Sequence, residues 1–166
     1  MPGREPEMDI IPYEPCYRDD FVSLNRAWIE GLFVLEGPDL DLFENVDSRT
    51  ESGAVILLGL EFGSVIATCM ATPLGGDVWE LEKLTVAEGH RGRGLGTMML
   101  RATIDAMRDR GCRRVLILTN SKLSDAVHIY MREGFREVPV DPSFGYGRVD
   151  LQLEKTLTDR SWDHPS

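Results

Sequence analysis

The sequence predicts a single mixed α/β domain, in which a sheet of parallel and antiparallel strands lies between helices on both faces. Strand and helix patterns alternate along the chain, and two neighbouring strand patterns are joined by a tight turn. A strand–helix–strand unit between residues 78 and 119 implies a right-handed parallel crossover. The 166 residues suit one domain with a sizeable core. We place this domain at residues 1–156 and a loose tail at residues 157–166.

The first part of the chain predicts one strand and one long helix. Residues 9–15, "DIIPYEP", form a short strand pattern that prolines bring to an end. Residues 17–33 predict an amphipathic helix, whose buried face is expected to carry the apolar residues at helical spacing, Phe21, Leu24, Trp28 and Leu32. The acidic stretch 34–46 is expected to hold a loop and one short helix.

The centre of the sheet follows. Residues 54–76 read as two strands joined by a tight turn at Glu61-Phe62-Gly63, and residues 77–86 as a further strand. A helix is predicted over residues 94–111, with Gly111 at its end and one face formed by Met99, Thr103, Ala106 and Met107.

Residues 112–120 form an apolar run typical of a buried strand. A second helix is predicted over residues 123–134, with Ser124 as its N-cap and Gly134 past its end. Residues 135–140 and 147–155 complete the set of strands.

The charge and cysteine content exclude several classes of protein. With 18 basic and 28 acidic residues the net charge is -10, which disfavours nucleic-acid binding and weakly favours a cationic small molecule or a basic peptide. No apolar stretch is long enough to span a membrane, and the first ten residues show no apolar signal region. Three widely spaced cysteines fit neither a disulfide framework nor a metal site. We expect a cytoplasmic protein without a membrane partner.

The most informative stretch is "LTVAEGHRGRGLGTMML", in which a strand leads into a glycine loop and then a helix. The start of such a helix has unpaired N–H groups and the positive end of the helix dipole, so it suits a pyrophosphate. Gly92, Gly94 and Gly96 allow close approach of the backbone, and Arg91 and Arg93 add positive charge. A tight turn with solvated arginines is the alternative. No Gly-Lys pair and no G-x-G-x-x-G spacing occurs here, so neither nucleotide motif fits.

The Arg-x-x-Gly-x-Gly pattern at residues 91–96 resembles the signature of the GNAT superfamily of N-acetyltransferases. "AVHIYMREGF" (126–135) and "WELEKLTV" (79–86) extend the resemblance, which runs from about residue 55 to about residue 140. It implies a mostly antiparallel seven-stranded sheet with a V-shaped splay between its fourth and fifth strands. Those strands are expected at residues 78–86 and 114–119, and the pantetheine of acetyl-CoA is expected between them.

The same resemblance implies which residues bind acetyl-CoA, the acetyl donor. The backbone of Leu84, Thr85 and Val86 is expected to meet the pantetheine. The glycine loop is expected to hold the pyrophosphate through Arg91, Gly92, Arg93, Gly94, Leu95, Gly96 and Thr97. Asn120 either hydrogen-bonds the cofactor or caps the next helix.

Acetyl transfer to an amine calls for a base and for an acid that protonates the departing thiolate. Glu80 and Glu82 are candidate bases, and in a regular strand they share a face with Val78 and Leu84. The resemblance favours Glu80, whereas a solvated strand face paired with Lys83 is the alternative reading. Tyr130 is the candidate acid, with a buried core tyrosine as the alternative.

These observations predict an N-acetyltransferase that moves the acetyl group of acetyl-CoA to a primary, cationic amine by direct attack. The alternative is a non-catalytic regulatory module that binds acetyl-CoA or CoA. The acidic stretch 36–47 is a candidate wall of the acceptor groove, whereas Trp28 is expected in the core. The resemblance leaves a homodimer open. His90 and His128 have no partner at metal or triad spacing, and no metal is expected.

Overall fold

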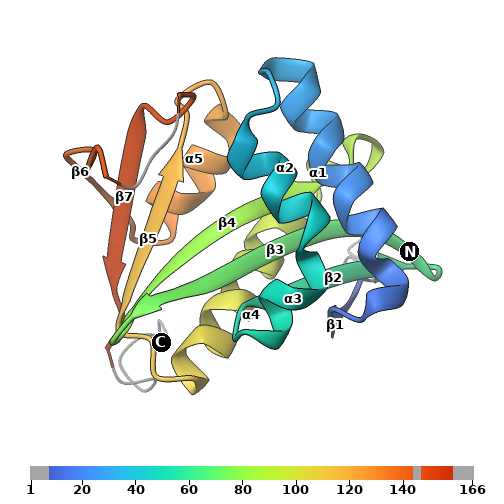
Figure 1. Cartoon of the computed structure of the whole chain (residues 1–166), viewed down its shortest axis with the longest axis horizontal. Coiled ribbons are helices and arrows are strands. Elements are labelled where there is room, and N and C mark those ends of the chain that lie inside the picture. Colours follow the sequence, from blue (N-terminus) through green and yellow to red (C-terminus); the bar gives the residue numbers. More distant parts are fainter. Residues whose placement is uncertain (1–7, 144–146, 159–166) are drawn as a thin grey trace.

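Seven strands form one sheet at the centre of the described chain, which comprises residues 8–143 and 147–158 of a computed structural model (Figure 1). The strand order is β1-β2-β3-β4-β5-β7-β6. Only the β4–β5 pair is parallel among these neighbours. The strands are β1 Asp9–Pro12, β2 Val55–Glu61, β3 Ser64–Gly75, β4 Val78–Val86, β5 Arg114–Thr119, β6 Arg136–Val138 and β7 Leu151–Thr156. The predicted fold class is therefore confirmed.

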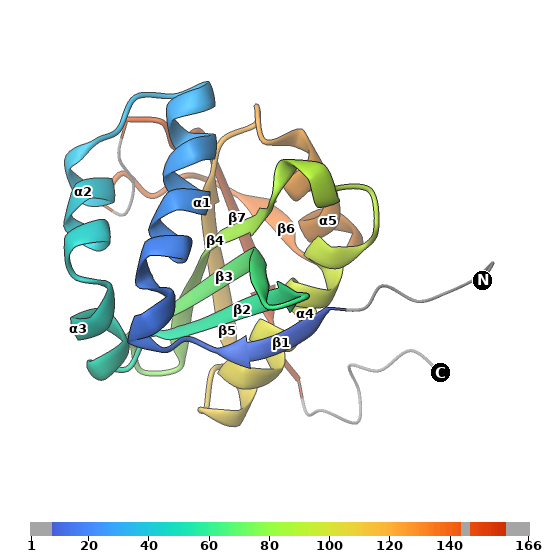
Figure 2. The ribbon, with the colours of Figure 1, turned by 90° about the vertical axis from the view of Figure 1, so that its right-hand side faces the viewer.

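Helices cover both faces of this sheet, as Figure 2 shows edge-on. On one face lie α1 (Arg18–Leu32), α2 (Gly37–Glu44) and α3 (Val46–Glu51), which enclose one apolar cluster with β2 and β3. On the other lie α4 (Leu95–Asp109) and α5 (Ser124–Arg132), which enclose a second and larger cluster. Single 3-10 turns, η1 (Pro15–Tyr17) and η2 (Glu88–His90), precede α1 and the glycine loop.

The buried face of α1 differs from the predicted one. Phe21, Asn25 and Ile29 are buried at four-residue spacing, whereas Leu32 is 50% exposed. Leu24 and Trp28 are only partly buried. The apolar pattern indicated the neighbouring stripe because Asn25, at the centre of the buried one, is polar and its role is set by partners on the sheet.

The acidic stretch 34–46 holds one short helix, α2, as expected, and a further short helix, α3, follows in residues for which none was predicted. Helix α2 begins with a capping box, in which Glu36 accepts from the backbone of Asp39 and Asp39 accepts from the backbone N–H of Glu36 at 2.8 Å. Helix α3 follows at once and buries Val46 in the same cluster as Leu42.

Two predicted details at the helix and chain ends are also corrected. The N-cap of α5 is Leu123 and not Ser124, because Asn120 organises the turn before the helix: its carbonyl accepts from Leu123 N at 2.9 Å and its Oδ1 accepts from Lys122 N at 2.8 Å. Leu157, predicted to lie in the tail, is 2% exposed and packs in the larger core cluster. Residues 159–166 of that tail lie outside the described residues.

The sheet splits between β4 and β5, as predicted. The two strands pair only from Val78 to Glu80 on β4 and from Arg114 to Leu116 on β5. Beyond Glu80, β4 stays with β3 and β5 stays with β7, so the strands diverge.

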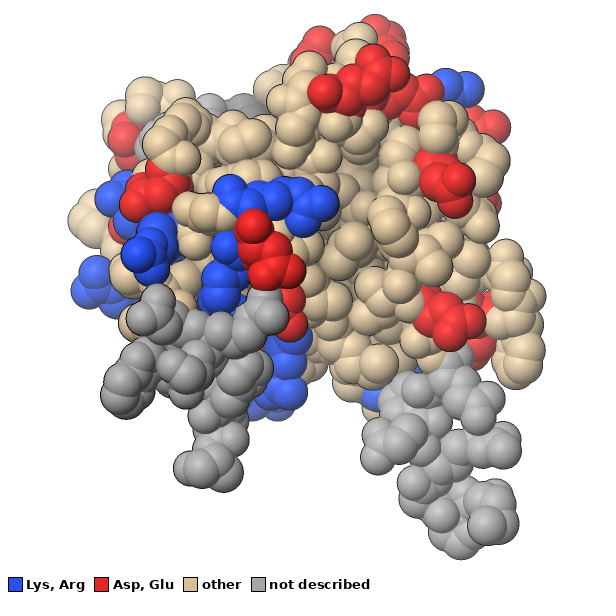
Figure 3. Space-filling model, turned by 90° about the horizontal axis from the view of Figure 1, so that it is seen from below, with Lys and Arg blue, Asp and Glu red and all other residues tan. Residues whose placement is uncertain are grey.

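Charges are unevenly spread over the surface: on the face in Figure 3, Lys and Arg side chains gather to one side and uncharged side chains fill the middle.

Candidate active site

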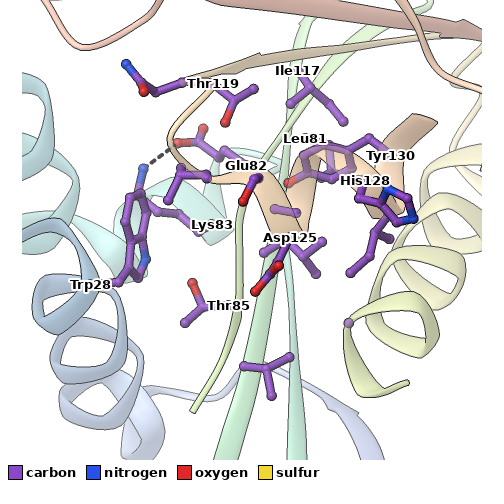
Figure 4. Close-up of a pocket in the computed structure, with 18 of the residues that line it drawn as sticks. Trp28, Leu81, Glu82, Lys83, Thr85, Ile117, Thr119, Asp125, His128 and Tyr130 are labelled. Atoms are coloured by element: carbon purple, nitrogen blue, oxygen red, sulfur yellow. Dashed lines mark hydrogen bonds and ion pairs between the residues drawn. The ribbon is translucent and has the colours of Figure 1, made fainter. Parts of the chain in front are cut away.

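A cavity of about 600 Å³ lies at the split between β4 and β5 (Figure 4). Its walls come from α1, the second half of β4, the glycine loop with the start of α4, the end of β5, and α5. Arg148 and Val149, just before β7, complete it. The cavity therefore brings together elements that lie far apart in the sequence, at the place where the resemblance puts the pantetheine.

The glycine loop forms one end of this cavity. Gly92 and Gly94 have φ values of 80° and 78°, which other residues adopt only under strain. Helix α4 begins directly afterwards at Leu95, so its first N–H groups have no partner within the helix. Gly96 serves packing, because a Cβ there would lie 2.9 Å from Cδ1 of Ile129 on α5. Of the predicted loop residues, the cavity is lined by Arg91, Gly92, Gly94, Leu95, Gly96 and Thr97.

Arg93 does not belong to this lining. Its guanidinium forms a two-point ion pair with Glu61, at the end of β2. Arg91 lines the cavity and donates from Nε to the carbonyl of Val86 at 3.2 Å. The two arginines of the motif thus face different surroundings.

Strand β4 contains a bulge beyond the point at which it separates from β5. The register with β3 shifts between Thr68 and Met70, and Lys83 has a φ of 57°. A bulge changes which face the following side chains point to. Leu84 and Val86 consequently pack against the α4 side, and the prediction that Leu84 shares a face with Glu80 and Glu82 is wrong. The sequence pattern already indicated the bulge, because the apolar positions of this strand are odd-numbered at 79 and 81 but even-numbered at 84 and 86.

A buried polar network anchors the bulge to α1. Asn25 donates to the Thr68 hydroxyl at 3.2 Å and accepts at Oδ1 from the Thr85 hydroxyl at 2.7 Å and from Trp28 Nε1 at 3.0 Å. The Thr68 hydroxyl in turn donates to the carbonyl of Lys83 at 2.7 Å. Buried polar groups need such partners, so the single asparagine of the α1 core face fixes the shape of β4 beside the cavity.

The two glutamates of β4 lie on the α1–α3 face and both line the cavity. Glu82 pairs with Lys83 at 3.0 Å (Figure 4). Glu80 is the last residue of β4 that pairs with β5. Burial, with the charge of Glu82 as a second cause, raises the pKa of Glu80 to about 8. A carboxyl group with such a pKa exchanges its proton in the range where a base is useful.

Tyr130, the predicted acid, lies across the cavity from Lys83 and Trp28 (Figure 4). Only 4% of the residue is exposed, and its ring packs edge-on against Phe135 with centroids 5.9 Å apart. Burial raises the pKa of its phenol, so the hydroxyl stays protonated at neutral pH. This position is compatible with both interpretations of Tyr130, the acid and the core tyrosine, since it is a core side chain that also borders the cavity.

The end of the cavity away from the glycine loop contains residues that the sequence reasoning missed. Arg148 pairs with Asp39 at 2.7 Å from Nη1 to Oδ2 and lies 5.9 Å from the ring centroids of both Trp28 and Phe33. Glu36 lies 3.7 Å from the same guanidinium. Trp28 lines the cavity and is not confined to the core. No local pattern marks Arg148, whose partner is 109 residues away.

The remaining predicted positions are Leu84, Thr85, Val86 and Asn120, all of which line the cavity. The side-chain amide of Asn120 donates to the carbonyl of Arg148 at 2.6 Å, and its oxygen accepts from Lys122 N. Both ends of that amide are therefore engaged within the chain.

Within residues 8–143 and 147–158 no group of three or more His, Cys, Asp or Glu side chains is arranged to hold a metal ion. No helix in the same ranges has the length and apolar character needed to cross a membrane.

Comparison with known proteins agrees with this geometry. Residues 13–135 match the Acetyltransferase (GNAT) family. An acetyltransferase of the GNAT family from Staphylococcus aureus Mu50 has a similar structure, with a TM-score of 0.83 and 19% identity, over 92% of this chain and 100% of that one. The structure of yncA from Salmonella typhimurium with its cofactor acetyl-CoA has a TM-score of 0.73 and 19% identity over 93% of this chain and 96% of that one.

Among curated proteins, streptothricin acetyltransferase of Streptomyces lavendulae is 33% identical over 67 residues, which are 40% of this chain and 35% of that protein. The match therefore spans about a third of that relative's length. Since the family match covers most of the chain, the protein belongs to the GNAT family of acetyltransferases.

Proposed function

We propose that this protein is an acetyl-CoA-dependent N-acetyltransferase that acetylates a primary amine by direct attack. The observation that carries the proposal is the shared cavity: the glycine loop, a partly buried carboxyl group with a raised pKa and a buried tyrosine all border the split between β4 and β5. A structural domain with a surface arginine loop would need neither Glu80 nor Tyr130 at this cavity.

Acetyl-CoA is proposed to lie with its pyrophosphate at the start of α4 and its pantetheine in the split. The left-handed glycines and unpaired N–H groups at that helix start suit an anion. Beyond Glu80 the edge of β4 that faces β5 has no partner among the described strands, so backbone groups of Leu84–Val86 are proposed to bond the pantetheine amides, apart from the carbonyl of Val86, which already accepts from Arg91. An N–H near Leu84 is proposed to polarise the thioester carbonyl.

In the chemical step, the amine nitrogen attacks the carbonyl carbon of the thioester. A C–N bond forms, the C–S bond breaks, and the proton of the ammonium form passes to Glu80, directly or through one water. The departing thiolate takes its proton from the hydroxyl of Tyr130. The second proton that the nitrogen loses on becoming an amide passes through water to the Tyr130 oxygen, which restores the phenol, and Glu80 returns its proton to solvent. Glu82 is proposed to shape the field around Glu80, since its charge raises the pKa of that neighbour while Lys83 lowers it.

The acceptor is proposed to be cationic. We call the end of the cavity away from the glycine loop the acceptor end. Among the described residues, Lys83 and Arg148 lie there, each already paired with a carboxylate of the chain, and Lys122 lies there with its Nζ 5.6 Å from the ring centroid of Phe33. Four carboxyl groups surround them, those of Glu36, Asp39, Glu80 and Glu82. With Glu80 ionised, as the base must be, these four carboxylates outnumber the three cations. This excess, with the ring of Trp28 beside it, favours an ammonium group over an acceptor that carries its own carboxylate.

A panel of amines tests the proposal by release of free CoA thiol. Primary alkylamines and diamines should be turned over in preference to α-amino acids of matched side chain. Thermal stabilisation by acetyl-CoA should be seen without any acceptor. Stabilisation without turnover across the panel would favour the non-catalytic CoA-binding module, and absence of both would reject the cofactor site.

A further inference from the structure

The second arginine of the glycine-loop motif is anchored away from the cavity. Both Nη atoms of Arg93 reach the carboxylate of Glu61, with Nη1 at 3.2 Å from Oε1. The Glu61 side chain is only 11% exposed. His90 completes the cluster, since its Nδ1 lies 3.3 Å from Glu61 Oε1 and 3.0 Å from Arg93 Nη1. The loop is thereby fastened to a carboxylate 32 residues earlier in the chain.

Glu61 is itself held in a fixed place. It is the last residue of β2, directly before the tight turn in which Phe62 and Gly63 both have positive φ values. Glu61 pairs across the hairpin with Ser64, and Leu60 before it pairs with Val65. The start of the loop is tied to the same hairpin, because Ala87 N donates to the carbonyl of Ile66 at 2.8 Å. Figure 2 shows the hairpin and the chain before α4 on the same side of the molecule.

The cavity lining agrees with this arrangement. His90, Arg91, Gly92 and Gly94 border the cavity, whereas Arg93 between them does not. A guanidinium that is bonded at two points to one carboxylate has most of its donors committed. The ion pair between Arg93 and Glu61 therefore stabilises the conformation of the loop.

We propose that Arg93 is a positioning residue: it holds the glycine loop on the β2–β3 hairpin through Glu61 and does not contact phosphate. Arg91 is then the arginine of the motif that faces the bound pyrophosphate. Affinity for acetyl-CoA depends on Glu61, although this acidic residue lies outside the cavity and would by charge alone oppose an anion. The inference rests on the proposed binding of acetyl-CoA at this loop.

A double-mutant cycle tests the anchor by the Kd of acetyl-CoA. Arg93→Met and Glu61→Gln should each raise the Kd by a similar factor, about 3- to 10-fold, and the double variant should be no worse than either. The reversed pair Glu61→Arg with Arg93→Glu should restore much of the affinity, because the ion pair is rebuilt. Arg91→Met serves as the control, and its loss should add fully to that of Glu61→Gln.

A phosphate contact by Arg93 predicts the opposite pattern. Arg93→Met would then weaken binding while Glu61→Gln would not, and the reversed pair would bind worse than Arg93→Met alone; either result overturns the anchor. Amide exchange of residues 88–94 in the ligand-free protein gives a second reading. Exchange should be faster in both single variants, and unchanged exchange also counts against the anchor. If wild-type protein fails to bind acetyl-CoA, the proposed function falls, and the exchange data still judge the anchor.

Discussion

Lys83 and Glu82 form an ion pair of 3.0 Å although they are consecutive residues of one strand. Consecutive side chains of a regular strand point to opposite faces. The φ of 57° at Lys83 and the shifted register with β3 turn both side chains to the same face. The bulge thus places the ammonium group of Lys83 as a counter-ion beside the carboxylate of Glu82. Only 4% of the Lys83 side chain and 17% of the Glu82 side chain are exposed.

Loss of the lysine should therefore be more harmful than loss of the pair. Lys83→Met leaves the carboxylate of Glu82 buried without that partner, and the free energy of unfolding should fall by about 3 kcal/mol. The double variant with Glu82→Gln should recover part of this loss, because no uncompensated charge remains. Urea unfolding at neutral pH measures both. If the double variant is less stable than Lys83→Met, the pair is not what stabilises the bulge.

The raised pKa of Glu80 gives a prediction for the pH dependence of the rate. Below about pH 8 the wild-type side chain is protonated, so kcat/KM for an amine should rise with pH and then level off as the carboxylate forms. Glu80→Gln relies on free amine, so its kcat/KM should keep rising to the pKa of the amine, about 10 for an alkylamine. The deficit of the variant should therefore shrink from about pH 8 upwards.

Profiles of the two glutamate variants on one amine decide between the candidate bases. Glu82→Gln should show a smaller deficit and the same acetyl-CoA affinity. If Glu80→Gln loses the same factor at every pH, Glu80 positions the substrate and is no base. If Glu82→Gln alone shows the pH-dependent deficit, the base is the carboxylate next to the bulge.

Tyr130→Phe keeps the ring packed on Phe135 and removes the hydroxyl. Loss of a positioned proton donor should lower kcat by about 100-fold or more. The Kd of acetyl-CoA and the melting temperature should stay close to wild type, because the apolar contacts of the ring survive. Turnover at the wild-type level would mean that water protonates the thiolate and that Tyr130 serves packing.

Gly94→Val tests the loop as the cofactor site. A side chain at φ 78° is strained, and this one would stand where the backbone is proposed to approach the pyrophosphate. Acetyl-CoA should then no longer raise the melting temperature. Gly111→Val is the matched control, since Gly111 also has a positive φ of 90° and open space for a Cβ, but lies at the far end of α4. Equal loss of the acetyl-CoA response in both variants would speak against a specific contact at Gly94.

Local patterns were enough for most of the fold. Helix α4, the β2–β3 hairpin and β5 were predicted because apolar periodicity and glycines are properties of neighbouring residues. The face of α1 was predicted wrongly because Asn25 owes its burial to Thr68 and Thr85, which lie on two other elements. Helix α3 was missed because it has only six residues, most of them polar.

In the candidate site too, residues in local motifs were predicted and residues held by distant partners were not. Loop glycines, Glu80 and Tyr130 stand in contiguous motifs, and all line the cavity. Arg148 and Glu61 act through partners at separations of 109 and 32 residues, and no periodicity reports such contacts. The positive φ of Lys83 in the bulge likewise depends on the register with β3 and on the network around Asn25. The pattern of a single strand contains no information on either.

Asp39 has two functions at one carboxylate. It closes the capping box of α2 and it receives the guanidinium of Arg148 from the other end of the chain, with its own side chain fully buried. Any replacement of Asp39 therefore loosens the helix start and reshapes the acceptor end together. A change of acceptor preference at this wall should consequently be easiest at Val149, which borders the cavity without capping a helix, whereas a change at Asp39 also lowers the stability of the fold.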